Sequence, residues 1–282
     1  MKTYKEFRVS TVPFDVDIIS GLLWQLDIDG INEFDDHLTV FVENTKDVSR
    51  KNLEEILQVL TNEKIIESFS IEEGVVEDRN WNEEYEKNVK VIEVTDKVVI
   101  KPSFKEYSSK PGQTIITIDP KMSFGTGDHA TTKLVIQSIE KYITGGEKVL
   151  DVGSGTGVLG ICTVMLGAKN AIGIDNDEWC LLNGNENVKA NNLEGKVNIR
   201  LGELKDIEES DFDLIVANIN KNILLDIAEE LRAKIKKTGI LILSGLLFSD
   251  ENDIIKAYSA LNFQLKEKSA MDEWIALVLK IN

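Results

Sequence analysis

A short apolar strand that runs directly into a glycine-rich turn constrains this chain more than any other feature. Residues 148–152 read Lys-Val-Leu-Asp-Val and are followed by Gly153-Ser-Gly155-Thr-Gly157 and then by an apolar helix. Glycine adopts left-handed backbone conformations without strain, and the first turn of a helix presents unpaired N–H groups. Open α/β sheets bind their ligands at the carboxyl ends of such strands. The sequence therefore predicts a ligand-binding loop at residues 153–157.

The rest of the C-terminal part alternates between strand and helix patterns. Further strands are predicted at residues 171–174, 197–201, 212–217 and 240–244, and helices at residues 158–166, 178–191, 223–235 and 250–261. Two last strands, 263–267 and 274–279, are joined by a short turn. Alternation of this kind indicates a doubly wound sheet. We therefore expect an α/β fold with a mostly parallel, seven-stranded sheet that includes an antiparallel C-terminal strand.

The N-terminal part shows a different order of elements. Strands are predicted at residues 4–9, 30–34, 37–42 and 65–71, and helices at residues 15–26 and 48–60. This βαββαβ order is the α+β ferredoxin-like pattern, and it contains no catalytic constellation. We interpret residues 1–74 as a substrate-recognition domain, 75–100 as a linker and 101–282 as the catalytic domain. Trp81 and Tyr85 in the linker share one face if it is helical, where they pack on a core or contact the substrate.

The glycine-rich turn by itself fits two cofactor classes. The run from Gly155 to Gly160 satisfies the GxGxxG pattern of dinucleotide-binding proteins. Asp175 ends the second strand, where an acid binds the ribose hydroxyls of either NAD or S-adenosylmethionine. Asp151 stands ahead of the glycines, and the resulting DxGxGxG spacing resembles the first motif of class I methyltransferases. The terminal hairpin and the polar Asn218 after the fourth strand also favour S-adenosylmethionine.

A more specific resemblance lies upstream of the first strand. Residues 119–132 read DPKMSFGTGDHATT. This stretch resembles the DPxxxFGTGxHxTT signature of the bacterial ribosomal protein L11 methyltransferases, and it precedes the DxGxGxG strand by the interval found in that family. The similarity runs from about residue 77 to the end of the chain. It departs from the family at Tyr85, where a second tryptophan is usual, and at Asn220 and Lys221, where small residues are usual.

The resemblance implies an S-adenosylmethionine-dependent enzyme that methylates amino groups, on lysine side chains or the N-terminal amine, of ribosomal protein L11. It also implies which residues bind the cofactor, namely Thr132, Gly153, Asp175 and Asn218, and the loop glycines Gly155 and Gly157 complete that set. The amide of Asn218 can orient a neutral amine, which makes it the candidate catalytic residue.

Simpler structural roles compete with these functional ones. Thr132 can cap a helix predicted at residues 133–142, and Asn218 can satisfy the end of its strand. His129 can act as a base or fix its loop. Three other functions stay open: a methyltransferase for another protein or a small molecule, an NAD-dependent oxidoreductase, and a catalytically silent binding module.

Composition narrows the choice of partners and cofactors. The net charge of −17 disfavours nucleic acid, whose phosphates are repelled, and suits a basic protein partner. The chain contains only two cysteines, Cys162 and Cys180, and two histidines, so we expect no zinc or other metal site. The N-terminus lacks an apolar signal core, and no apolar run reaches membrane-span length. We therefore expect a cytoplasmic protein, and a monomer.

Overall fold

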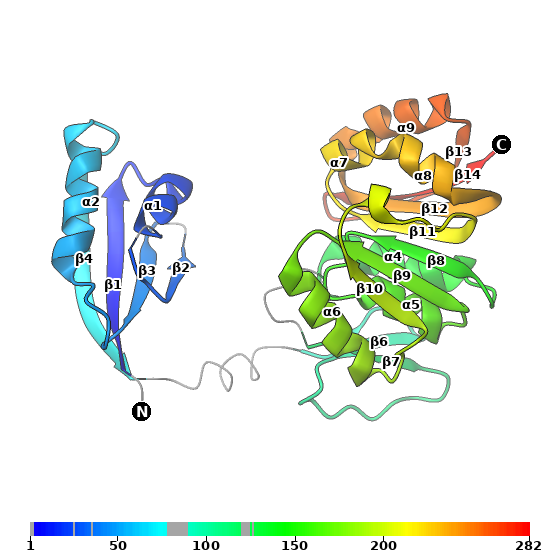
Figure 1. The fold of residues 1–282 in the computed structure, drawn as a ribbon, viewed down its shortest axis with the longest axis horizontal. Coiled ribbons are helices and arrows are strands. Elements are labelled where there is room, and N and C mark those ends of the chain that lie inside the picture. Colours follow the sequence, from blue (N-terminus) through cyan, green and yellow to red (C-terminus); the bar gives the residue numbers. More distant parts are fainter. Residues whose placement is uncertain (1–2, 25, 35, 78–89, 120–124, 126) are drawn as a thin grey trace. The chain divides into compact units, whose positions relative to one another are not determined.

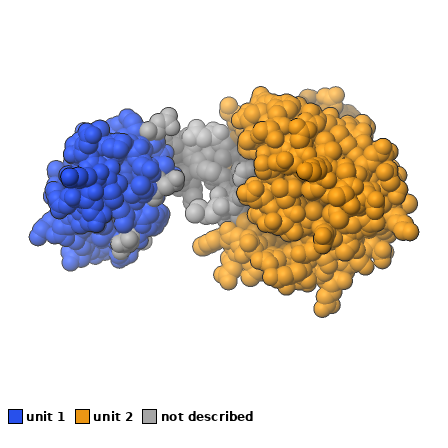
Figure 2. Space-filling view, turned by 90° about the horizontal axis from the view of Figure 1, so that it is seen from above, with its two compact units in different colours: residues 1–88 blue, residues 89–282 orange. Residues whose placement is uncertain are grey.

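The computed structural model describes residues 3–24, 26–34, 36–77, 90–119, 125 and 127–282. The chain divides into two compact units, residues 1–88 and 89–282, which Figure 2 shows in blue and orange. Each unit has buried apolar clusters of its own, so each is described by itself. Trp81 and Tyr85 of the expected linker lie outside the described residues.

The first unit is a four-stranded sheet with two helices. Its elements are β1 (Thr3–Val12), α1 (Val16–Leu23), β2 (Gly30–Glu33), β3 (Leu38–Glu43), α2 (Arg50–Asn62) and β4 (Ser68–Glu77). The strand order is β2-β3-β1-β4, and every neighbouring pair is antiparallel. Phe7 and Val9 of β1 are buried with Leu53 and Leu57 of α2. The antiparallel order of the strands confirms the ferredoxin-like fold. The helix α2 packs on the sheet because alternate residues of β1 point to one face, where they are apolar.

A small three-stranded sheet opens the second unit. It consists of β5 (Ile92–Glu93), β6 (Val98–Lys101) and β7 (Thr114–Thr117), with β5–β6 antiparallel and β6–β7 parallel. The sequence reading assigned residues 75–100 to a linker, whereas β4 continues to Glu77, and β5 and most of β6 fall inside that range. Strands of two and four residues are too short to show a recognisable alternation in the sequence. They hold their place through burial of Val98 and Ile100 in the core of the unit.

The large sheet has the predicted strands in a doubly wound order. They are β8 (Lys148–Val152), β9 (Asn170–Asp175), β10 (Val197–Leu201), β11 (Phe212–Asn218), β12 (Ile235–Leu247), β13 (Phe263–Met271) and β14 (Trp274–Ile281). Their order is β10-β9-β8-β11-β12-β14-β13. The strands from β8 to β12 are parallel to one another, and β14 is antiparallel to both β12 and β13. The expected fold, with its antiparallel C-terminal strand, is therefore confirmed (Figure 1).

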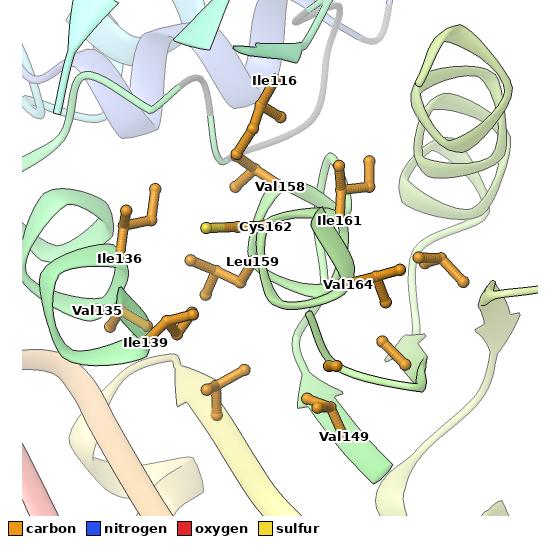
Figure 3. Close-up of a cluster of buried hydrophobic side chains, with 14 of the residues drawn as sticks. Ile116, Val135, Ile136, Ile139, Val149, Val158, Leu159, Ile161, Cys162 and Val164 are labelled. Carbon is orange, nitrogen blue, oxygen red and sulfur yellow. The ribbon is translucent and has the colours of Figure 1, made fainter. Parts of the chain in front are cut away.

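Helices cover both faces of this sheet. One apolar cluster joins the sheet to α4 (Ala130–Tyr142), α5 (Val158–Met165) and α6 (Glu178–Ala190). The other joins it to α7 (Lys221–Asp226), α8 (Ala228–Lys234) and α9 (Glu251–Ala260). Figure 3 shows part of the first cluster, where Val135 and Ile139 of α4 face Leu159 of α5. Cys162 lies in the same cluster, and burial raises the pKa of its thiol.

Several boundaries differ from those that the sequence predicts, and the clearest differences lie around β12. The helix predicted at residues 223–235 is two helices, α7 and α8, separated at Ile227. The strand predicted at residues 240–244 begins at Ile235, where it pairs with Phe212, and extends to Leu247. Pairing with β11 and β14 keeps the two ends of β12 extended, although their sequence pattern alone does not specify a strand. Among the described residues, no helix combines the length and the apolar character needed to cross a lipid bilayer.

Candidate functional site

The glycine-rich turn connects β8 to α5, and it requires glycine at each expected position. Gly153, Gly155 and Gly157 have φ values of 72°, 53° and 78°, a left-handed region that favours glycine. A Cβ atom added to Gly153 would lie 2.3 Å from Cγ2 of Ile219. Gly157 is also the N-cap residue of α5. The turn is therefore shaped by backbone conformation and close approach, as the sequence predicted.

Asp175 lies at the carboxyl end of β9, beside the turn. Its Oδ2 accepts a hydrogen bond from the Gly155 N–H at 2.8 Å, and its Oδ1 accepts one from the Asp177 N–H at 3.1 Å. A carboxylate oxygen can accept more than one hydrogen bond. Asp175 therefore holds the turn in place and keeps acceptor capacity for a ligand hydroxyl.

A cavity of about 390 Å³ opens at this end of the sheet. Gly153 and Asp175 line it together with Glu203, Ile219 and Asp226. Two of the expected cofactor residues are thus on its wall, Gly153 from the turn after β8 and Asp175 from the last position of β9. The cavity lies where ligands bind in doubly wound sheets.

Asp151, the acid ahead of the glycines, is buried beneath the turn. Its Oδ2 accepts a hydrogen bond from the Gly160 N–H at 2.9 Å, and the described residues provide no partner for its Oδ1. Burial raises the pKa of Asp151 to about 7; the Gly160 hydrogen bond opposes that rise, and the charge of Asp175 adds to it. The group therefore carries a proton over much of the mildly acidic range.

Thr132 does not cap its helix, so the competing structural role considered for it does not apply. Helix α4 begins at Ala130, and its N-cap is His129, whose Nδ1 accepts a hydrogen bond from the Thr131 N–H at 3.3 Å. Thr132 lies in the first turn, 1% exposed, and its hydroxyl has no hydrogen-bond partner among the described residues. Since buried polar groups are nearly always paired, this hydroxyl is a candidate for contact with a ligand.

Asn218 shows the same feature at the end of β11. It pairs with Ser244 of β12, and its Oδ1 is buried without a partner in the described part of the chain. The strand pairing involves the backbone and leaves the amide oxygen unused. Thr132, Gly155, Gly157 and Asn218 are not among the residues that line the 390 Å³ cavity.

Asn220 and Lys221, which depart from the family pattern after Asn218, have structural roles. Asn220 is the N-cap of α7, and its Oδ1 accepts a hydrogen bond from the Ile223 N–H at 3.3 Å. Lys221 Nζ lies 3.0 Å from Asp250 Oδ1 and 3.4 Å from Asp253 Oδ2. These contacts fix the loop that follows Asn218 to α7 and α9.

A second cavity, of about 460 Å³, was not predicted from the sequence. The segment before α4 contributes Gly125, Asp128 and His129, and the β13–β14 turn contributes Asp272, Glu273 and Trp274. The rings of His129 and Trp274 meet edge to face, with centroids 4.9 Å apart. The wall thus combines carboxylates with an aromatic ring, a composition that attracts cations. The sequence signals for this cavity are His129 in the segment before α4 and the adjacent carboxylates Asp272 and Glu273.

Residues 120–124 and 126 of the expected signature lie outside the described residues. Within the described part of the chain, no group of three or more His, Cys, Asp and Glu side chains is placed to hold a metal ion.

Comparisons with known proteins agree with this geometry. The model of the family described as ribosomal protein L11 methyltransferase matches residues 26–282. A ribosomal protein L11 methyltransferase of Alkaliphilus oremlandii is 37% identical over 207 residues, which is 73% of this chain and 66% of that protein, just under two thirds of its length. One from Ruminiclostridium cellulolyticum is 31% identical over 315 aligned positions, covering 99% of this chain and 98% of that protein.

A solved structure extends the likeness to three dimensions. The crystal structure of a ribosomal protein L11 methylase from Lactobacillus delbrueckii subsp. bulgaricus matches with a TM-score of 0.64 and 31% identity. The match covers 68% of this chain and 99% of that one. The chain therefore belongs to the ribosomal protein L11 methyltransferase family, and its large sheet has the class I methyltransferase fold.

Proposed function

We propose that this protein transfers methyl groups from S-adenosylmethionine to amino groups of ribosomal protein L11. The observation that carries the proposal is the 390 Å³ cavity, which Gly153 of the DxGxGxG turn and Asp175 line at the carboxyl ends of β8 and β9. The family relationship supplies the acceptor, because the relatives are named for ribosomal protein L11. We also propose that the protein acts as a cytoplasmic monomer that binds this protein rather than nucleic acid.

The residues present fit the cofactor. Gly153 leaves room that a side chain would fill, and Asp175 offers carboxylate oxygens to ribose hydroxyls. The buried hydroxyl of Thr132 and the buried amide oxygen of Asn218 are available as further contacts, since nothing in the described residues pairs with them. We assign Gly155 and Gly157 to the same site through the backbone of the turn. When bound, the sulfonium of the cofactor supplies an activated methyl group.

The second cavity is a suitable entrance for the acceptor amine. Asp272 and Glu273 attract a cationic side chain, and the ring of Trp274 offers a face for it. The amine must reach the methyl group without its proton. At pH 7 that costs roughly 4.6 kcal/mol for a lysine with its reference pKa, and about 1 kcal/mol for an α-amine. Exclusion of water lowers the pKa of an amine and reduces this cost.

We assign Asn218 the role of orienting the neutral amine. The variant Asn218→Ala should lower kcat roughly 10- to 100-fold, because much of the rate of a displacement comes from alignment of the reactants. Single-turnover methylation at saturating cofactor measures the effect. If the variant bound S-adenosylmethionine more weakly and yet kept the same turnover at saturation, the orienting role would be wrong.

We also assign residues 1–74 to recognition of the protein substrate. The unit of residues 89–282 contains the large sheet and both apolar clusters that flank it, so it can be tested separately. Its affinity for S-adenosylmethionine should match that of the full chain, while kcat/KM for ribosomal protein L11 should fall roughly a hundredfold, since about 2.7 kcal/mol of binding is lost. Full efficiency of the shortened chain on intact substrate would contradict the assignment.

The proposal as a whole is tested by mass spectrometry of ribosomal protein L11 after incubation with the enzyme and S-adenosylmethionine. Mass gains in methyl steps that map to amines would establish both reaction and substrate. Cofactor binding without a mass gain would retain the methyltransferase and discard this acceptor. Binding of NAD in place of S-adenosylmethionine would indicate an oxidoreductase, and binding of neither would indicate a silent module.

A further inference from the structure

Three asparagines occupy one face of α6 at intervals of four residues. Asn183 is 3% exposed and Asn187 is 1% exposed, and Asn191, one residue past the end of the helix, is half-buried. Side chains four apart lie above one another on a helix. Asparagine is a poor helix former, because its side chain competes for backbone hydrogen bonds. A buried row of asparagines on a helix therefore calls for partners outside that helix.

Those partners lie on the free edge of β7 and the residues that continue it, beside α6 (Figure 1). Asn191 accepts a hydrogen bond from the Thr117 N–H at 2.8 Å and donates one to the Thr117 carbonyl oxygen at 2.7 Å. Asn187 Oδ1 accepts from the Asp119 N–H at 3.0 Å, and Asn183 Nδ2 donates to the Asp119 carbonyl oxygen at 3.0 Å. The side-chain amides thus replace the strand that would otherwise pair with this edge.

Asn187 makes one contact that the other two do not. Its Nδ2 donates a hydrogen bond to the carbonyl oxygen of Thr156 at 3.0 Å. Thr156 belongs to the glycine-rich turn and is fully buried. One amide therefore holds both the start of the segment that leads to α4, at Asp119, and the turn that lines the proposed cofactor site.

Thr156 provides a second connection between the same two segments. Its hydroxyl donates a hydrogen bond to the carbonyl oxygen of Gly125 at 2.7 Å. Gly125 has a φ of 106°, and a Cβ atom there would lie 2.8 Å from that hydroxyl oxygen. Gly125 also lines the second cavity, with Asp128 and His129. The Thr156 hydroxyl thus joins the glycine-rich turn to the wall of the second cavity at Gly125, and Asn187 joins the same turn to Asp119.

We propose that Asn187 and Thr156 are positioning residues that lock the glycine-rich turn to the segment preceding α4, so that cofactor binding and acceptor placement depend on each other. The inference rests on the proposed function for the identity of the two ligands. Neither residue needs to touch a ligand, because each acts through a backbone carbonyl whose position it sets. The two hydrogen bonds lie in the protein interior, where the loss of one leaves an unpaired carbonyl.

The test compares Asn187→Ala with Asn191→Ala in the full-length chain. Both variants remove hydrogen bonds to the same strand edge, but only the first releases the Thr156 carbonyl oxygen. We expect both to lower Tm. We expect Asn187→Ala alone to raise the Kd for S-adenosylmethionine about tenfold, the effect of one lost hydrogen bond, and to raise KM for ribosomal protein L11 as well. Equal changes in Kd for the two variants, or no change in either, would overturn the proposal.

Thr156 supplies an independent arm of the same test. Thr156→Val removes the hydroxyl with little change in volume, and Thr156→Ser keeps the hydroxyl. We expect the valine variant to reproduce the effect of Asn187→Ala on Kd and KM, and the serine variant to restore wild-type values. Equal impairment in the serine and valine variants would show that the hydrogen bond to Gly125 is not responsible.

A readout that needs no ligand separates this inference from the proposed function. In cofactor-free protein, Asn187→Ala and Thr156→Val should each speed amide hydrogen exchange in residues 127–132, whereas Asn191→Ala should leave that segment unchanged. Failure of the wild-type protein to bind S-adenosylmethionine would refute the proposed function alone. Unchanged exchange in residues 127–132 for both variants would refute the connection between the two segments.

Discussion

Replacement of Gly153 by alanine should weaken binding of S-adenosylmethionine by roughly 10- to 100-fold. The residue has a φ of 72°, where a non-glycine residue costs about 1–3 kcal/mol, and each 1.4 kcal/mol is tenfold in affinity. The added Cβ atom would also lie 2.3 Å from Cγ2 of Ile219, which lines the same cavity. The turn or Ile219 must move, and either movement changes the wall of the proposed cofactor site. Isothermal titration calorimetry measures the affinity.

Gly195 provides a matched control for this substitution. It has a φ of 81°, and an added Cβ atom would meet nothing within 4 Å. Gly195→Ala should therefore show the conformational strain as a lower Tm, with the affinity for S-adenosylmethionine unchanged. A Gly153→Ala protein that binds the cofactor as tightly as wild type would remove the turn from the proposed site.

Substitution of Asp151 by asparagine should abolish a pH dependence of stability. The pKa of Asp151 in the folded protein is about 7, against an ordinary value of 3.8. Between these values the folded state keeps a proton that the unfolded state releases, so the free energy of unfolding falls as pH rises from about 4 to 7 and stays low above that. The full shift corresponds to on the order of 4 kcal/mol. An asparagine cannot ionise, so the variant should be more stable than wild type at pH 8 and similar to it near pH 4.

Urea unfolding of cofactor-free protein between pH 5 and 8.5 measures this effect. Glu209 provides a control of opposite sign. Its hydrogen-bonded ion pair with Arg200 lowers its pKa to about 2, so its contribution is present above about pH 4.5 and is lost as pH falls toward 2. Glu209→Gln should therefore leave the slope above pH 5 unchanged. Parallel stability curves for wild type and Asp151→Asn across this range would contradict the assigned pKa.

The connection between the two cavities changes how the family signature is understood. Within residues 119–132 the sequence assigns a cofactor contact to Thr132. In the structure the segment also carries Asp128 and His129 to the second cavity, and it is held to the glycine-rich turn through Asn187 and Thr156. A substitution of Asn187 or Thr156 should therefore weaken the binding of both ligands. A substitution on the wall of one cavity should weaken the binding of one ligand only.

The sequence by itself determined the features that depend on local chemistry. The periodicity of apolar residues specified the four-stranded and the seven-stranded sheet and their helices, because burial of one face requires that spacing. The glycines at 153, 155 and 157 indicated a turn with positive φ values, and all three residues have positive φ in the structure. Asp175 was placed beside that turn because the carboxyl ends of adjacent parallel strands meet at one edge of a sheet.

Only the tertiary structure decided which distant residues share a site. Trp274 meets His129 because β14 lies between β12 and β13 and its first residue reaches the start of α4, a proximity that no local pattern encodes. Asn187 of α6 joins Asp119 to Thr156 through its side-chain amide, a connection between the two motifs that no local pattern encodes. The raised pKa of Asp151 likewise arises from burial among neighbouring elements. Hydrogen bonding and burial depend on distances in space, and these follow from the order of the strands in the sheet and the packing of helices on it.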